Sequence, residues 1–441
     1  MENLNAQKIM KRLEEKGFAC YMVGGAVRDH LMGLNLRDID LATSAKPEEL
    51  AEIFKDTKVD FFGRRFAVTS INGIEVATFR GESYQSPGKP QVHFLDSFKE
   101  DAARRDFTIN SMAMDLAGNI IDFHGGQDDL AQGLIKTVGK AQLRFAEDPI
   151  RVLRGVYFAC RFDFTIEAKT LRAMSASQKD LLTIPKERIG KEAIKALEIQ
   201  ALTCWLKRIE KISLLESVLP ELAHLPGKEQ NPKYHHLDVW EHTLAVLLHC
   251  ESSEPRDQIL ILAALFHDCA KGLPEIRTYS EETSYPSDQG HELLGPEISD
   301  QVLRQWGLGK KARKDIGLLI RHHMWLPEDL KTASIVNYLN PMAEDFSNLE
   351  DFELFLKRLK ILKKGDIIGK NPDNLQADIK YLNEVFDRIF IILQHIPFFR
   401  SQTSIDPRAF PEEGLALKRR LAEELSLCQR LKIEEYDKNN I

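Results

Sequence analysis

Residues 21–45, YMVGGAVRDHLMGLNLRDIDLATSA, decide the fold of the N-terminal part of the chain. The apolar run that ends at Val23 predicts a strand, and the Gly24-Gly25 pair predicts a turn followed by a short helix. Residues 38–42 predict a second strand. The order strand, glycine turn, helix, strand is typical of an α/β domain.

Two aspartates stand on the second of these strands. Because successive side chains on a strand point to opposite faces, Asp38 and Asp40 project from the same face. Two carboxylates placed in this way can hold a pair of divalent cations such as Mg²⁺. An isolated D-x-D pattern is more often a solvated strand end, so the surrounding sequence must decide between the two interpretations.

A hairpin is expected immediately downstream. Residues 66–71 and 74–79 alternate in polarity and are joined by Asn72-Gly73, a dipeptide typical of tight hairpin turns. Within it, Glu75 either supplies a third carboxylate near the metals or lies on the surface, and the pattern leaves both open. Residues 81–91 contain two prolines and two glycines and are expected to form a mobile loop.

Composition places the chain among soluble globular proteins. It has 441 residues, of which 43% are hydrophobic, and it contains no apolar run of the length that a membrane span needs. The first 18 residues predict an amphipathic helix rather than an export signal. The cysteines lie far apart and are expected to be buried, reduced thiols of a cytoplasmic protein; they are Cys20, Cys160, Cys204, Cys250, Cys269 and Cys428.

The distribution of charge and the hydrophobic periodicity indicate what to expect of the rest of the chain. A net charge of -7 argues weakly against a nucleic-acid binder that uses its whole surface, but the basic residues between 133 and 161 could face phosphates. From about residue 140 onward almost every segment has helical periodicity. An α/β head is therefore expected to precede an all-helical body.

Four segments occur in a fixed order within the head: YMVGGAVRD, RDIDLATSA, GIEVATFR and RRDFTINSMAMD. Together they resemble the nucleotide-binding head of the tRNA nucleotidyltransferases shared by bacteria and eukaryotes and of bacterial poly(A) polymerases. The resemblance implies an enzyme with two metal-binding aspartates, Asp38 and Asp40, that act with Mg²⁺. It also implies residues that contact the nucleotide's triphosphate and ribose, namely Gly24, Gly25, Arg28, Arg104, Arg105, Asp106 and Asn110.

The segment FAEDPIRVLRG carries a second set of charged residues. Read by itself, Asp148 before Pro149 could simply cap a helix, with Glu147 and Arg151 as a surface pair. The segment resembles the family's E-D-x-x-R motif, which implies that Asp148 and Arg151 hydrogen-bond the Watson-Crick edge of cytosine or adenine. Arg154 is expected to contact the nucleotide too, and the later Glu187-Arg188 pair resembles a motif that braces the helix.

A histidine-aspartate pattern follows in the body. His242, His267-Asp268 and Asp366 resemble the H, HD, D ligands of the HD phosphohydrolase superfamily, which implies a transition metal such as Mn²⁺ or Ni²⁺. His291 and either His322 or His323 could complete a second metal site. The alternative is a scaffold in which these histidines are ordinary core residues.

The resemblance implies an α+β fold: a small mixed or antiparallel-sheet head, then an all-α neck, body and HD domain. The expected boundaries are 1–138 for the head, 139–225 for the neck, 226–375 for the HD domain and 376–441 for a helical tail.

The implied function is addition of the 3′ CCA end, or part of it, to tRNA from CTP and ATP without a nucleic-acid template. Residues 79–92 are shorter and less basic than the family's usual loop, which leaves CC-only or A-only addition open. Two further functions stay open as well: that of a poly(A) polymerase, and that of an HD phosphohydrolase that acts on RNA ends or phosphoesters.

Overall fold

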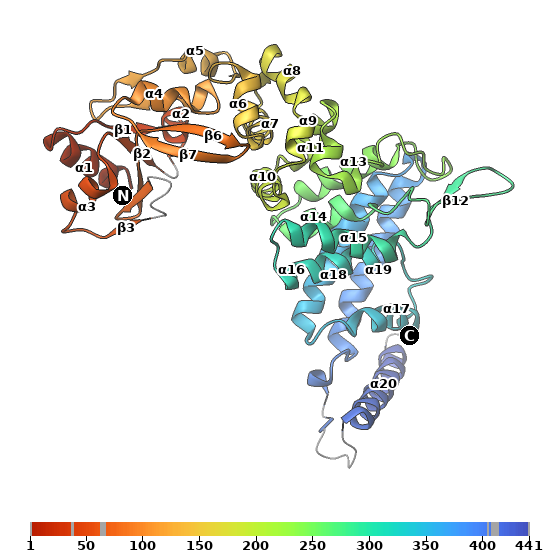
Figure 1. Cartoon of the computed structure of the whole chain (residues 1–441). Helices are drawn as coiled ribbons and strands as arrows, with labels where there is room; N and C mark the ends of the chain where they lie inside the picture. Colours follow the sequence, from red (N-terminus) through yellow and green to blue (C-terminus); the bar gives the residue numbers. More distant parts are fainter. Residues whose placement is uncertain (1, 37–38, 62–67, 404, 407–413, 440–441) are drawn as a thin grey trace. The chain divides into compact units, whose positions relative to one another are not determined.

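The computed structural model describes residues 2–36, 39–61, 68–403, 405–406 and 414–439 (Figure 1). The chain folds into two compact units, Met1–Pro220 and Glu221–Ile441. The first unit contains a mixed sheet and helices, whereas the second is almost entirely helical. The expected α+β class is confirmed.

The head sheet has the strand order β3-β4-β5-β2-β1-β8-β9 within the described residues. Its central strands are β1 (Cys20–Val23), β2 (Asp40–Thr43) and β5 (Ile74–Thr78). β2 runs parallel to β5 and antiparallel to β1, so the sheet is mixed as expected. The outer strands are β3 (Val59–Phe61), β4 (Val68–Ile71), β8 (Ala113–Met114) and β9 (Ile120–Ile121).

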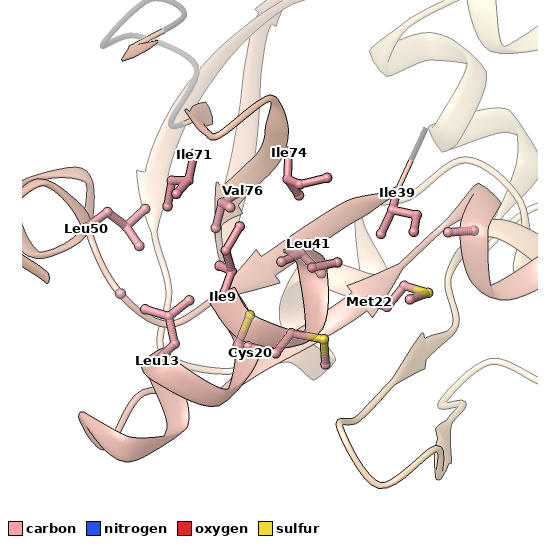
Figure 2. Close-up of a cluster of buried hydrophobic side chains, with 14 of the residues drawn as sticks. Ile9, Leu13, Cys20, Met22, Ile39, Leu41, Leu50, Ile71, Ile74 and Val76 are labelled. Atoms are coloured by element: carbon pink, nitrogen blue, oxygen red, sulfur yellow. The ribbon is translucent and has the colours of Figure 1, made fainter. Parts of the chain in front are cut away.

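Side chains alternate along the strands, so apolar residues are buried on both faces of the head sheet. Cys20, Met22 and Leu41 point into one core, where they pack with residues of α1 (Glu2–Glu15) and α3 (Pro47–Ile53) (Figure 2). Val23 and Ala42 point to the other face and pack against α4 (Phe98–Ala103). Asp40 alternates with Leu41, so it lies on the α4 side of the sheet.

The hairpin and glycine-turn predictions are confirmed for the described residues. β4 and β5 pair antiparallel, and Asn72 and Gly73 both adopt positive φ, as a primed hairpin turn requires. α2 (Gly25–Leu31) follows β1 directly after Gly24, whose φ is 68°.

The predicted loop at residues 81–91 is wrong. The chain instead forms a second hairpin from β6 (Arg80–Ser86) and β7 (Lys89–Phe94), which turns at Gly88. Polar side chains of this hairpin are held by ion pairs and hydrogen bonds on one of its faces, as described below.

Helices follow the head sheet in the first unit. They are α5 (Gly126–Ala131), α6 (Ala141–Glu147), α7 (Ile150–Phe162), α8 (Ala168–Ala176), α9 (Gln178–Leu181), α10 (Lys186–Glu198), α11 (Leu202–Lys211) and α12 (Leu215–Val218). Cys160 on α7 forms a disulfide with Cys204 on α11. The expectation that all six cysteines are reduced is therefore wrong for this pair, whose residues are 44 apart in sequence and meet only where the two helices pack.

Gly155 on α7 provides a test of this packing. A Cβ there would lie 2.3 Å from Met174 Cε and 2.7 Å from Phe107 Cζ. Replacing Gly155 by alanine should lower the free energy of unfolding by about 1–3 kcal/mol, because the core must move to admit the methyl group. Urea unfolding measures the change, and Gly309→Ala, where a Cβ meets nothing within 4 Å, is the control. A Gly155→Ala protein as stable as the control variant would contradict the packing described.

The second unit is built from long helices. They are α13 (Val239–Glu251), α14 (Gln258–Phe266), α15 (His291–Gln305), α16 (Lys310–His322), α17 (Thr332–Ala343), α18 (Leu349–Ile368), α19 (Leu375–His395) and α20 (Gly414–Asn439). Asp238 caps α13 by accepting a hydrogen bond from Glu241 N. No helix in the described part of the chain is long and apolar enough to cross a membrane.

Candidate functional site: a charged cavity in the head and a histidine cluster in the second unit

A cavity of about 870 Å³ opens in the first unit, between the head sheet and helices α7 and α10. Asp40 lines it, together with the residues expected to contact a nucleotide, which are Gly24, Gly25, Arg28, Arg104, Arg105, Asp106, Asn110, Asp148, Arg151 and Arg154. Segments more than 100 residues apart in sequence thus meet around one space. Asp38 lies outside the described residues.

The glycine turn gives two guanidinium groups room beside it. A Cβ on Gly24 would lie 3.2 Å from Arg105 Nη1, and a Cβ on Gly25 would lie 3.4 Å from Arg28 Nη2. Gly24 also has a positive φ that disfavours other residues. Larger residues at this turn would push both arginines away from the sheet.

A chain of hydrogen bonds forms one wall of the cavity. Arg28, which is buried, donates to Asn110 Oδ1 at 2.6 Å and to Asp29 Oδ1. Asn110 donates in turn to Asp106 Oδ1, and Arg154 Nε donates to Asp106 Oδ2 at 2.8 Å. Burial alone would raise the pKa of Asp106, but the Arg154 charge keeps that pKa below its usual value. These groups therefore hold one another in place along the wall.

Arg104 and Arg105 share one buried carboxylate. Asp101 on α4 accepts from Arg104 Nη2 at 2.8 Å and from Arg105 Nη2 at 3.1 Å, and it is 1% exposed. Asp101 was not among the residues predicted from the sequence, although its spacing of three and four residues from the two arginines was a usable signal.

The E-D-x-x-R segment occupies the junction of α6 and α7. Arg151 Nη1 donates to Glu147 Oε2 at 2.7 Å, and Arg188 Nη2 donates to Asp148 Oδ2 at 2.7 Å. Asp148 Oδ1 also accepts from Ile150 N, so its expected capping contact is present alongside its place in the cavity. Arg188 therefore contacts Asp148 directly.

Asp40 and Glu75 are neighbours across the sheet. The parallel pairing of β2 and β5 sets Asp40 opposite Glu75 in register, so both side chains leave the sheet on the same face. Both residues are exposed. Asp40 lines the cavity, and carboxylate oxygens are ligands that divalent cations prefer.

The second unit contains two groups of potential metal ligands. His242, His267 and Asp366 form one triad, and Asp268, His291 and His323 form the other; within each, the ligand atoms lie within 4.8 Å of one another. All of these residues are buried. His323 is the member of the His322-His323 pair that joins the cluster, whereas His322 packs against Phe355.

All four histidines are oriented in the same way. Their Nδ1 atoms lie 2.6–3.0 Å from the carbonyl oxygens of Gly369, Ala264, Asp288 and Ile320. A carbonyl can only accept, so each Nδ1 carries a proton and Nε2 is the ring nitrogen that faces the cluster. Nε2 atoms meet at 3.3 Å in the pairs His242–His267 and His291–His323. Nε2 atoms this close together could bind the same metal ion.

Asp268 belongs to the second triad and also faces the first. Its Oδ2 lies 3.3 Å from His267 Nε2, and its Oδ1 lies 3.2 Å from His291 Nε2. Both oxygens are buried without a hydrogen bond of good geometry, although Lys271 Nζ lies 2.8 Å from Oδ2. Burial alone would raise the pKa of Asp268, yet His267 and Lys271 hold it well below its usual value. Ionised aspartate and neutral imidazoles are the forms that bind metal.

Family models match three parts of the chain. The poly A polymerase head domain matches residues 20–136, a probable RNA and SrmB-binding site of polymerase A matches residues 163–225, and an HD domain matches residues 239–350. The three matches follow one another along the chain as a nucleotidyltransferase head, an RNA-binding region and an HD domain.

Its curated relatives are CCA-adding enzymes. The enzyme of Lactobacillus johnsonii is 39% identical to this chain over 51% of this chain and 57% of its own length. The enzyme of Enterococcus faecalis is 44% identical over 44% of this chain and 48% of its own length. The chain thus matches about half the length of these relatives.

Solved structures share the fold over nearly the whole chain. The Bacillus stearothermophilus CCA-adding enzyme in complex with CTP has a TM-score of 0.59 at 22% identity, covering 99% of this chain and 97% of that one. The Thermotoga maritima CCA-adding enzyme complexed with tRNA has a TM-score of 0.59 at 20% identity, covering 100% and 95%.

Proposed function

We propose that the chain is a nucleotidyltransferase that adds the 3′ CCA end, or part of it, to tRNA from CTP and ATP. The observation that carries the proposal is the meeting of Asp40, the glycine turn, the RRD arginines and the E-D-x-x-R residues around one cavity. The relatives named as CCA-adding enzymes support it. The site of action would be the cytoplasm, where tRNA, ATP and CTP occur together.

Each group in the cavity has a distinct task. Arg28, Arg104 and Arg105 bind the triphosphate through charge-assisted hydrogen bonds. Asp148 accepts from the exocyclic amino group of cytosine or adenine, and Arg151 donates to the ring nitrogen beside it. Uracil and guanine offer the opposite pattern of donors and acceptors at these positions, so they are rejected.

Asp38 and Asp40, with Glu75 beside Asp40, would hold Mg²⁺. When bound, divalent ions supply activation of the attacking hydroxyl and stabilisation of the leaving oxygen. The 3′ oxygen of the tRNA bonds to the α-phosphorus, the bond from that phosphorus to the bridging oxygen breaks, and pyrophosphate leaves. The phosphate-binding arginines orient the two oxygens in line.

The test uses tRNA that ends before CCA, tRNA that ends in CC and complete tRNA, each incubated with CTP or ATP alone. A CCA-adding enzyme should extend the first with CTP, the second with ATP, and leave the third unchanged. Extension of only one of the first two would establish a partial enzyme. Long adenosine tails on complete tRNA would favour poly(A) polymerase instead.

A second activity, hydrolysis of phosphoesters, is favoured by the four inward Nε2 atoms around Asp268. The residues His242, His267, Asp268 and Asp366 would hold a transition metal such as Mn²⁺ or Ni²⁺, which suits imidazole ligands. Water would attack phosphorus and the ester oxygen would leave. Incubation with a 2′,3′-cyclic nucleotide and Mn²⁺ or Ni²⁺ tests this activity, and absence of hydrolysis by the intact protein would refute it.

A further inference from the structure

The β6–β7 hairpin contributes three polar side chains to the wall of the cavity. Arg80, Glu82 and Tyr84 stand two residues apart on β6, so they share a face, and all three line the cavity. The Glu82 side chain is only 6% exposed. A carboxylate buried to this degree needs partners of opposite charge or good hydrogen-bond donors.

Glu82 joins two arginines that have different tasks in the proposed reaction. Its Oε1 accepts from Arg104 Nη1 at 2.7 Å, and its Oε2 accepts the Tyr84 hydroxyl at 2.5 Å. Arg151 Nη2 lies 3.9 Å from the same Oε2. One carboxylate thus adjoins both the phosphate-binding arginine and the base-reading arginine.

Tyr84 connects Glu82 to Arg151. Arg151 Nη2 donates to Tyr84 Oη at 3.3 Å. Burial, and next to it the neighbouring Glu82, raise the pKa of Tyr84, so the phenol keeps its proton at neutral pH. Because that proton goes to Glu82, the Tyr84 oxygen is left to accept from Arg151.

Four contacts together define the plane of the Arg151 guanidinium. Nη1 donates to Glu147 Oε2 and to the carbonyl oxygen of Arg144, while Nη2 donates to Tyr84 Oη and to the carbonyl oxygen of Arg104. Two of the four partners, Glu147 and Arg144, belong to α6, directly before the helix that carries Arg151. Tyr84 hydrogen-bonds Arg151 from the hairpin, so it links the orientation of Arg151 to the head.

The tip of the hairpin is fixed to the same segment. Gly88 N donates to the carbonyl oxygen of Glu147 at 2.8 Å. A Cβ on Gly88 would lie 2.7 Å from Arg188 Nη1, and its φ of 70° further disfavours a side chain. The hairpin is thereby held against the base-reading residues at both its strand and its tip.

We propose that Tyr84, aligned by Glu82, is a specificity-determining positioning residue that orients the Arg151 guanidinium toward the incoming base. The proposal rests on the proposed nucleotidyl transfer. With Tyr84 in place, Arg151 donates toward a ring-nitrogen acceptor, which cytosine and adenine have. Without it, the guanidinium turns more freely and can donate to a uracil carbonyl instead.

The test is Tyr84→Phe, which removes the hydroxyl and keeps the ring. We expect the ratio of kcat/KM for CTP to that for UTP to fall by about tenfold, the usual effect of losing a hydrogen bond to a charged group. Glu82→Gln should lower the ratio as well, and should also raise KM for both nucleotides because Arg104 loses its carboxylate. Tyr21→Phe, in the same domain but packed on Phe79 and Phe98, is the matched control.

The outcomes distinguish a positioning role of Tyr84 from a purely structural one. A parallel fall of activity with CTP, ATP and UTP, or an unchanged CTP to UTP ratio, would overturn the proposal. Dissociation constants for CTP and UTP are measured on the same proteins. A wild-type protein that transfers no nucleotide would refute the proposed function, while the ratio of the two dissociation constants in Tyr84→Phe and wild type would still decide the role of Tyr84.

Discussion

Replacing Asp40 by alanine should lower the rate of nucleotide addition to tRNA by about 10³-fold or more. Metal ions held by carboxylates contribute several kcal/mol to the stabilisation of such transition states, and each 1.36 kcal/mol corresponds to a tenfold change in rate. Asp40 lines the cavity and pairs in register with Glu75. The measurement is single-turnover transfer of CMP from CTP to tRNA that ends before CCA, with Mg²⁺.

The control for this variant is Asp60→Ala. Asp60 stands on β3 at the edge of the same sheet, is exposed, and pairs with Lys58. It should leave the rate within about twofold of wild type, because exposed ion pairs of this kind contribute little. Unimpaired addition by Asp40→Ala would refute the metal assignment, and tRNA binding, measured separately, should survive the substitution.

The second large effect is expected at Asp268. Asp268→Asn keeps the shape of the side chain but removes the charge that faces both histidine triads. We expect the bound transition-metal content to fall from about two ions per chain to less than one, and phosphoester hydrolysis to fall by about 10³-fold, since a neutral amide is a poor metal ligand. Equilibrium dialysis followed by elemental analysis measures the metal directly.

Asp387→Asn is the control for Asp268→Asn. Asp387 is an exposed residue of α19 that pairs with Lys360. Nucleotide addition should continue in both variants if the head works by itself. Full metal content in Asp268→Asn would show that the cluster does not use this carboxylate, and would contradict the assignment.

The head was predictable because its signals are local. A strand followed by Gly24-Gly25, and a hairpin turn at Asn72-Gly73, each depend on a few adjacent residues whose backbone preferences are strong. The structure has both as expected. The prediction that Asp40, Arg104 and Arg151 belong to one nucleotide site came from the family resemblance, because no periodicity relates segments so far apart in sequence.

The error at residues 81–91 has a physical cause. Strands are recognised from alternating apolar residues, but β6 turns Glu82 and Tyr84 inward, where Arg104 and Arg151 neutralise and hydrogen-bond them. A strand face buried by ion pairs has the composition of a loop. Arg104 lies 22 residues after Glu82, and Arg151 lies 67 residues after Tyr84, so neither contact can be recognised from the local sequence.

Two other features required the three-dimensional structure. Cys160 and Cys204 pair because α7 packs on α11, which cysteine spacing does not reveal. The choice between His322 and His323 depends on the last turn of α16, where adjacent residues point about 100° apart. The structure directs His323 to Asp268 and His322 to Phe355.

Because Asp268 faces both triads, it affects the order in which two metal ions would bind. Two divalent cations that share one carboxylate lie close together and repel each other, so the second would bind more weakly than the first. Titration with a single metal would then proceed in two separate steps. At a low concentration of free metal the HD domain would bind one ion per chain. Both triads would be occupied only at a higher metal concentration.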